Sequence, residues 1–138
     1  MIRQLSIFAE NKKGAMHSIT RALAEAGVNM NTLITNDSAE FGIIRMLVSD
    51  TGKACECLRA AGYICREENV VAAEISDECG SLNRLLEALD SANINLDYLY
   101  VTYSTLSRLP VVILKASGLY ELEAFLRGKG CNTLERLV

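Results

Sequence analysis

Few side chains in this sequence have the chemistry for catalysis or metal binding, and their spacing favours neither. His17 is the only histidine, and a zinc site would need further cysteine, histidine or carboxylate ligands at a suitable spacing. Cys55 and Cys57 are two residues apart in a helical segment, so their thiols would point to different faces. Ser18 follows His17 directly, but adjacent residues do not form the facing nucleophile and base that covalent catalysis requires. We therefore expect no catalytic residue, no metal site and no cofactor.

A more informative pattern is a glycine before a helical segment and an asparagine after it, present twice. Gly14 and Asn29 in the first half correspond to Gly80 and Asn95 in the second, at a constant offset of 66 residues. A glycine at a helix N-terminus lets a ligand approach unpaired amides at the positive end of the helix dipole. An asparagine side chain both donates and accepts hydrogen bonds. Together these groups could bind a free amino acid. The same residues are also explained if the glycines and asparagines only shape and cap the turns.

The two pairs belong to a longer internal repeat. At the same offset, apolar positions of two helical segments coincide, so that Ile19 matches Leu85 and Leu23 matches Leu89. In the last third of each half the offset becomes 68 residues. We interpret the pattern as a divergent tandem duplication that makes two domains, residues 1–68 and 69–138, with almost no linker.

Each half contains the same order of periodic segments. In the first half, strand-like segments cover 3–9, 28–35, 41–49 and 63–68, and helical segments cover 16–26 and 51–62. In the second half, strand-like segments cover 70–75, 94–103, 110–116 and 131–137, and helical segments cover 82–92 and 119–130. The order βαββαβ, twice over, predicts an α+β fold of two ferredoxin-like units, each an antiparallel sheet with both helices on one face.

Composition narrows the range of partners and compartments. The chain has 138 residues, half of them apolar, and a net charge of −3. This balance favours a packed core over disorder and lacks the basic excess of a nucleic-acid-binding protein. The N-terminus does not resemble a signal peptide, and no segment approaches the ~18 apolar residues of a membrane span. Five cysteines, an odd number without framework spacing, suggest reduced thiols. We expect a cytoplasmic protein with no nucleic-acid or membrane partner.

Residues 9–30, AENKKGAMHSITRALAEAGVNM, resemble the start of an ACT domain, a small βαββαβ module that senses amino acids in metabolic enzymes. The segment is similar to the pattern of the serine-binding regulatory domain of phosphoglycerate dehydrogenase, which reads Asn-x-x-Gly, a helix, then Gly-Val-Asn. The resemblance implies that Asn11, Gly14 and Asn29 contact a ligand. It spans both halves, and small stand-alone proteins with two ACT domains form a known family of this length.

The second half departs from that pattern in its loop. Gly80 and Asn95 are kept, but Asp77 stands where the loop asparagine would be. A negative charge there opposes a ligand carboxylate, so this copy should bind more weakly or recognise an ammonium. The histidine of the serine-binding pattern is Ala9 here and Ile75 in the second copy. The resemblance therefore implies a small amino acid without specifying serine.

The candidate ligand-binding residues lie in the loops before the first helix of each half and at the start of the strand that follows. They are Asn11, Lys12, Gly14, Ala15, Met16 and Asn29 in the first half, and Asp77, Cys79, Gly80, Ser81, Leu82 and Asn95 in the second. We expect a non-catalytic regulatory protein that binds a small amino acid and modulates an enzyme or pathway of amino-acid metabolism. Apolar residues on both sheet faces favour a homodimer. The alternative is an interaction module that acts as a regulatory subunit and binds no small molecule.

Overall fold

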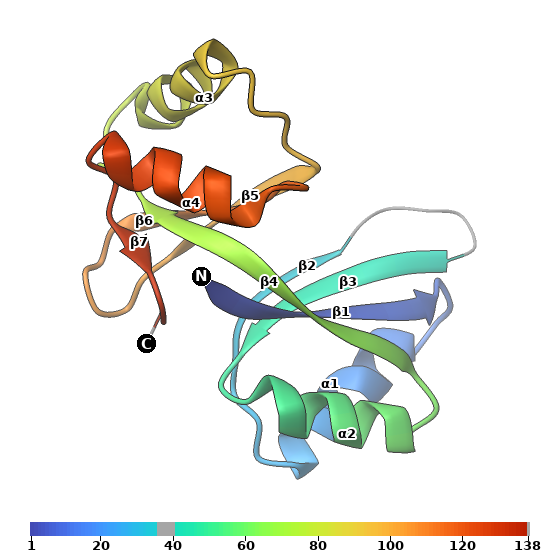
Figure 1. The fold of residues 1–138 in the computed structure, drawn as a ribbon. Helices are drawn as coiled ribbons and strands as arrows, with labels where there is room; N and C mark the ends of the chain where they lie inside the picture. The colour runs from blue at the N-terminus through green and yellow to red at the C-terminus, as the bar shows by residue number, and fades with distance from the viewer. Residues whose placement is uncertain (36–40, 138) are drawn as a thin grey trace. The chain divides into compact units, whose positions relative to one another are not determined.

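The computed structural model describes residues 1–35 and 41–137, which form two compact units (Figure 1). The first unit is Arg3–Glu68, and the second is Asn69–Val138 together with Met1–Ile2. Each unit has the α+β, ferredoxin-like arrangement that the sequence predicts, so that fold class is confirmed.

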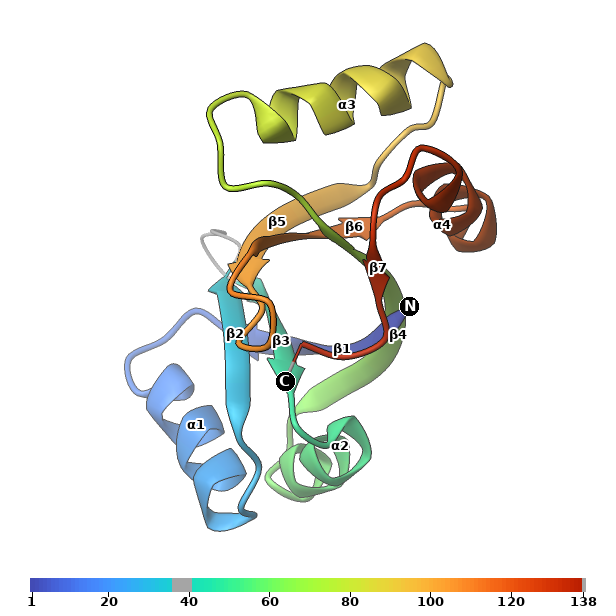
Figure 2. The ribbon, with the colours of Figure 1, turned by 90° about the vertical axis from the view of Figure 1, so that its left-hand side faces the viewer.

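The first unit is an antiparallel sheet with two helices packed on one side of it (Figures 1 and 2). Its sheet has the order β2-β3-β1-β4, which is the ferredoxin-like order. The elements are β1 (Ile2–Glu10), α1 (Ala15–Glu25), β2 (Met30–Thr35), β3 (Phe41–Val48), α2 (Thr51–Ala60) and β4 (Ile64–Glu74). Because β1 and β2 both run antiparallel to β3, they run in the same direction.

The second unit repeats this plan with the sheet order β5-β6-β4-β7. Its further elements are α3 (Ser81–Ser91), β5 (Tyr98–Tyr103), β6 (Pro110–Lys115), α4 (Leu119–Gly128) and β7 (Thr133–Leu134). The sequence predicts separate strands over 63–68 and 70–75, but the structure joins them in the single strand β4. The chain therefore passes from one unit to the next within a strand. The predicted closing strand over 131–137 is also shorter in the structure, with only β7 formed.

Each unit has its own apolar core, built from alternating strand residues and the inner faces of its two helices. In the first unit, Leu5 of β1 and Met46 of β3 pair across the sheet and pack with Leu23 of α1. In the second unit, Val112 of β6 packs with Leu89 of α3. All five residues are buried. Buried residues thus recur at every second position in the strands and at helical spacing in the helices, as the apolar pattern of the sequence predicts.

A side-chain N-cap stabilises the start of helix α2. Asp50 is extended, and its side chain accepts a hydrogen bond of 2.9 Å from the backbone N–H of Lys53. Replacing Asp50 with alanine leaves a first-turn donor without this partner and should lower the free energy of unfolding by about 1 kcal/mol. Urea denaturation followed by circular dichroism measures the change. Asp50→Asn, which keeps an acceptor, should stay close to wild type, and equal losses in both variants would contradict the cap assignment.

Two buried cysteines meet in the core of the first unit. The Sγ atoms of Cys55 on α2 and Cys65 on β4 lie 3.0 Å apart as free thiols. Burial, with the hydrogen bond to Cys55, raises the pKa of Cys65 to about 12. Its thiolate fraction at pH 8 is then about a thousandfold lower than that of an ordinary thiol.

This environment predicts the order in which the cysteines react. At pH 8 iodoacetamide should modify exposed Cys79 while Cys65 stays unmodified until the chain is unfolded in denaturant. Peptide mass spectrometry after timed alkylation measures both. Modification of Cys65 in the folded protein at a rate comparable with Cys79 would contradict the burial of this pair.

Candidate functional site

The repeated glycines form the same left-handed turn at the start of the first helix in each unit. Gly14 and Gly80 both have φ 85°, in the left-handed region that favours glycine. Each accepts the first helical hydrogen bond on its carbonyl, from the N–H of Ser18 and of Arg84, at 2.9 Å. Backbone conformation thus accounts for glycine at both positions. Neither helix has a side-chain cap, and the N–H groups of Ala15 and Ser81 donate to the loop carbonyls of Lys12 and Glu78, each at 3.2 Å.

A pocket of about 550 Å³ lies beside this turn in the first unit. It is bounded by the β1–α1 loop, the first turn of α1 and the adjoining ends of β2 and β3. The described residues that line it are Ala9, Glu10, Asn11, Lys12, Ala15, Met16, Thr35, Gly42 and Ile44. Four predicted site residues, Asn11, Lys12, Ala15 and Met16, therefore meet in one cavity. Gly14 shapes the turn between them without lining the pocket.

The first pocket presents both signs of charge close together. The Lys12 ammonium lies 3.0 Å from Glu10 Oε2, and the hydrogen bond to Glu10 raises the pKa of Lys12. Both side chains are mostly exposed, and such surface pairs contribute little to stability. A zwitterion can therefore exchange with this pair at small cost, with its carboxylate toward Lys12 and the helix amides and its ammonium toward Glu10.

The structure does not bring Asn29 to this pocket. The backbone N–H of Asn29 donates to Ser49 Oγ at 3.0 Å, and its Nδ2 donates to Asn31 Oδ1 at 3.1 Å. Asn29 follows the C-terminus of α1, whose 11 residues span about 16 Å. A crossover helix carries the chain to the opposite end of the sheet before β2 starts, so Asn29 lies away from the glycine loop of its own unit.

The same geometry separates Asn95 from Gly80 in the second unit. Asn95 is exposed in the segment after α3, which also has 11 residues. A ligand at the N-terminus of either helix therefore cannot contact the asparagine of the same unit.

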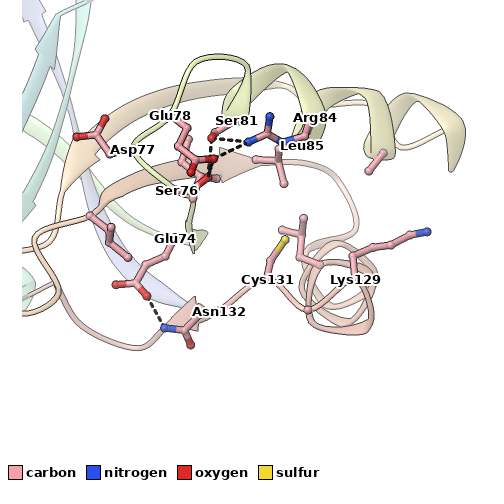
Figure 3. A pocket seen from close by; sticks show the side chains of 15 residues that line it. Glu74, Ser76, Asp77, Glu78, Ser81, Arg84, Leu85, Lys129, Cys131 and Asn132 are labelled. Carbon is pink, nitrogen blue, oxygen red and sulfur yellow. Dashed lines mark hydrogen bonds and ion pairs between the residues drawn. The ribbon is translucent and has the colours of Figure 1, made fainter.

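The second unit has a larger pocket, of about 720 Å³, between α3, the end of α4 and the segment after β4 (Figure 3). Its described lining combines polar and apolar side chains: Glu74, Ile75, Ser76, Asp77, Glu78, Ser81, Arg84, Leu85, Ala88, Leu109, Leu126, Lys129, Gly130, Cys131 and Asn132. Asp77 and Ser81, both predicted, are among them. The other predicted residues do not line it: Cys79 is exposed, Gly80 forms the turn, and Leu82 packs against the core.

Hydrogen bonds organise the polar side of the second pocket (Figure 3). Ser81 Oγ lies 2.7 Å from Ser76 Oγ and accepts from Arg84 Nη2 at 2.9 Å. Arg84 Nη2 also lies 3.4 Å from Glu78 Oε2. On the opposite side, Asn132 Nδ2 donates to Glu74 Oε2. Sequence reasoning missed Arg84, although its position three residues after Ser81 places both on one helix face.

Across residues 1–35 and 41–137, no group of three or more histidine, cysteine, aspartate or glutamate side chains is placed to hold a metal ion. No helix in those ranges is long and apolar enough to cross a membrane. His17 is exposed on the first turn of α1.

Comparison with known proteins shows which family the sequence resembles. The sequence matches the family model of the ACT domain pair over residues 1–117. No curated protein matches it. Among solved structures, protein BT0572 from Bacteroides thetaiotaomicron is 28% identical, with a TM-score of 0.88 over 96% of this chain and 91% of that chain.

More distant structures share the fold. The regulatory subunit of aspartate kinase from Thermus thermophilus, in its ligand-free form, is 15% identical, with a TM-score of 0.68 over 93% of this chain and 90% of that one. The corresponding subunit from Thermus flavus is also 15% identical, with a TM-score of 0.64 over 91% and 88%. At this identity the likeness concerns the fold alone. The family match covers most of the sequence, and the chain therefore belongs to the ACT domain pair family.

Proposed function

We propose that this protein is a non-catalytic, cytoplasmic regulator that binds a small amino acid in the first pocket. The observation that carries the proposal is the convergence, in one cavity, of Lys12, Glu10 and the uncapped first turn of α1. These groups complement the carboxylate and the ammonium of an α-amino acid. Ala15, Met16 and Ile44 leave an apolar wall for a small side chain.

Binding regulates through linkage. A ligand that prefers one arrangement of the protein shifts its population and thereby changes the activity of a partner. The likeness in fold to aspartate kinase regulatory subunits supports an enzyme of amino-acid metabolism as that partner. In this proposal residues 1–68 and 69–138 act as two ACT domains, and the protein works as a homodimer.

A thermal-shift assay of the intact chain against each of the twenty amino acids tests the proposal. A specific ligand in excess must raise the apparent stability, by about 2.7 kcal/mol at a hundred times its Kd. At least one small amino acid at millimolar concentration should raise the melting temperature. If none does, binding of an amino acid is contradicted.

A second candidate is an interaction module that binds no small molecule. The edge strand β2 favours it, since Met30, Leu33 and Ile34 are each more than a third exposed. Substituting Asn11 with alanine separates the two functions. If the Asn11→Ala variant no longer responds to an amino acid but still assembles, the protein is a sensor. If the wild-type chain responds to no amino acid, and Asn11→Ala affects the partner as wild type does, the protein is an interaction module.

A further inference from the structure

Two thiols of the first unit face each other in its core. Cys55 lies on α2 and Cys65 on β4, and their Sγ atoms are 3.0 Å apart. Each thiol also points at the backbone of the other residue. Cys65 Sγ donates to the carbonyl of Cys55 at 3.4 Å, and Cys55 Sγ donates to the carbonyl of Cys65 at 3.7 Å. These reciprocal contacts hold both buried sulfur atoms in one place between the helix and the sheet.

The start of β4 is bonded to the end of α2 at two further places. After α2, the backbone N–H of Tyr63 donates to the carbonyl of Leu58 at 3.0 Å and turns the chain back toward β4 (Figure 1). The side chain of Arg59 reaches from α2 to the strand, and its Nη2 donates to the carbonyl of Cys65 at 3.1 Å. Because these bonds already hold the two segments together, the sulfur atoms can bond to each other with little movement of the backbone.

The fold does not require cysteine at these two positions. With the 68-residue offset of the later part of the repeat, Cys55 corresponds to Glu123 and Cys65 corresponds to Thr133. The arginine is kept as Arg127, whose Nε donates to Thr133 Oγ1 at 2.6 Å. The same connection between helix and strand therefore forms in the second unit without sulfur, and the facing thiols are a property of the first unit alone.

We propose that Cys55 and Cys65 form a modification site, a dithiol that hydrogen peroxide converts to a disulfide between α2 and β4. One sulfur attacks the peroxide, the O–O bond breaks, and the products are a sulfenic acid and one water. The second thiol attacks the sulfenic sulfur, the S–S bond forms and the S–O bond breaks, and the thiol proton leaves with the oxygen as a second water. Two thiols thus lose two electrons to one peroxide. The proposal is independent of amino-acid binding, because neither cysteine lines the first pocket.

Burial determines how this site reacts. The thiolate is the form that attacks peroxide, and burial raises the pKa of Cys65, so the first step is slow. Once a sulfenic acid has formed, the partner sulfur is already beside it, and the disulfide forms before a second peroxide molecule can enter the core. The product is a disulfide, which a thiol reductant reverses, and not sulfinic acid, which such a reductant does not reverse.

Cys57 provides an internal control. It lies on the same helix two residues after Cys55, but it is only partly buried, and its Sγ donates to the carbonyl of Ala54 at 3.2 Å. In an unfolded chain, Cys55 and Cys57 would pair with Cys65 about equally, because loops of similar length close with nearly the same entropy. A preference of Cys65 for Cys55 therefore reports the folded geometry.

Peptide mapping of the intact folded chain after overnight exposure to millimolar hydrogen peroxide tests the site. The remaining thiols are blocked with N-ethylmaleimide in denaturant, and mass spectrometry of the digest identifies each disulfide. We expect the Cys55–Cys65 disulfide to exceed the Cys57–Cys65 disulfide at least about tenfold, because only Cys55 faces Cys65. Dithiothreitol should restore both thiols, and Cys57→Ala should form the Cys55–Cys65 disulfide as wild type does.

Removing one member of the pair should abolish the reaction of the other. In Cys55→Ala, the fraction of Cys65 in any disulfide should fall at least about tenfold, since Cys57 does not face it. Circular dichroism reports whether this variant folds, and if it does not, Cys55→Ser takes its place. The proposal is overturned if both thiols of the folded wild-type chain stay free after an exposure that fully oxidises the exposed Cys79. Equal amounts of the Cys55–Cys65 and Cys57–Cys65 disulfides would overturn it as well.

Discussion

Leu23→Ala and Leu89→Ala should each lower the free energy of unfolding by about 2–5 kcal/mol. The two leucines are matched positions of the repeat, on α1 and α3, and each is 2% exposed. Alanine removes the buried isobutyl group and leaves a cavity that a close-packed core fills only in part. Because each leucine belongs to the core of its own unit, either change should weaken the unit that contains it.

Urea denaturation of both variants, followed by circular dichroism, measures these losses. Leu106→Ala is a control in the same residue type, since Leu106 is 62% exposed and its truncation should change stability by less than about 0.5 kcal/mol. A loss below about 1 kcal/mol for both buried leucines would show that the helices are not packed on the sheets as described.

Ala15→Phe should abolish the thermal stabilisation that a small amino acid gives to the wild-type chain. Ala15 begins α1 and lines the first pocket beside Lys12 and Met16. A phenyl group there occupies the space proposed for the ligand, so the affinity should fall at least about a hundredfold, because the ligand loses both its contacts and its access to the helix amides.

The same substitution elsewhere on the helix is a matched control. Ala24→Phe places the ring on the exposed last turn of α1, away from the pocket. This variant should keep both the wild-type ligand response and a melting temperature near that of wild type. Equal ligand responses in Ala15→Phe and wild type, with both folded, would exclude the first pocket as the binding site.

Periodicity predicted the fold class because most of the helices and strands follow a local pattern of apolar residues. The apolar spacing of α1 and α3 and the glycine before each helix are visible in the sequence, and the structure forms both helices there. The continuous strand β4 was not predicted, because residues 63–68 and 70–75 were read as the end of one copy and the start of the next. Nothing in local propensity distinguishes one long strand from two adjacent short ones.

The binding residues were harder to predict, because a pocket depends on where distant segments meet. Asn11 was predicted from the ACT-like loop pattern, and Lys12 is its neighbour in that loop, whereas Thr35 and Gly42 reach the same cavity only through sheet pairing. That Asn29, which follows α1, lies at the end of the sheet opposite the glycine turn can be seen only in the structure.

A nuclear magnetic resonance titration of the ¹⁵N-labelled intact chain with the most stabilising small amino acid tests the central claim most directly. The largest amide shift changes should fall on residues 10–16 and on Thr35 and Gly42, which surround the first pocket. The Ala15→Phe variant should lose these changes. Saturable changes that leave residues 10–16 unaffected, or the same changes in the folded Ala15→Phe variant, would contradict the assignment of this pocket as the amino-acid site.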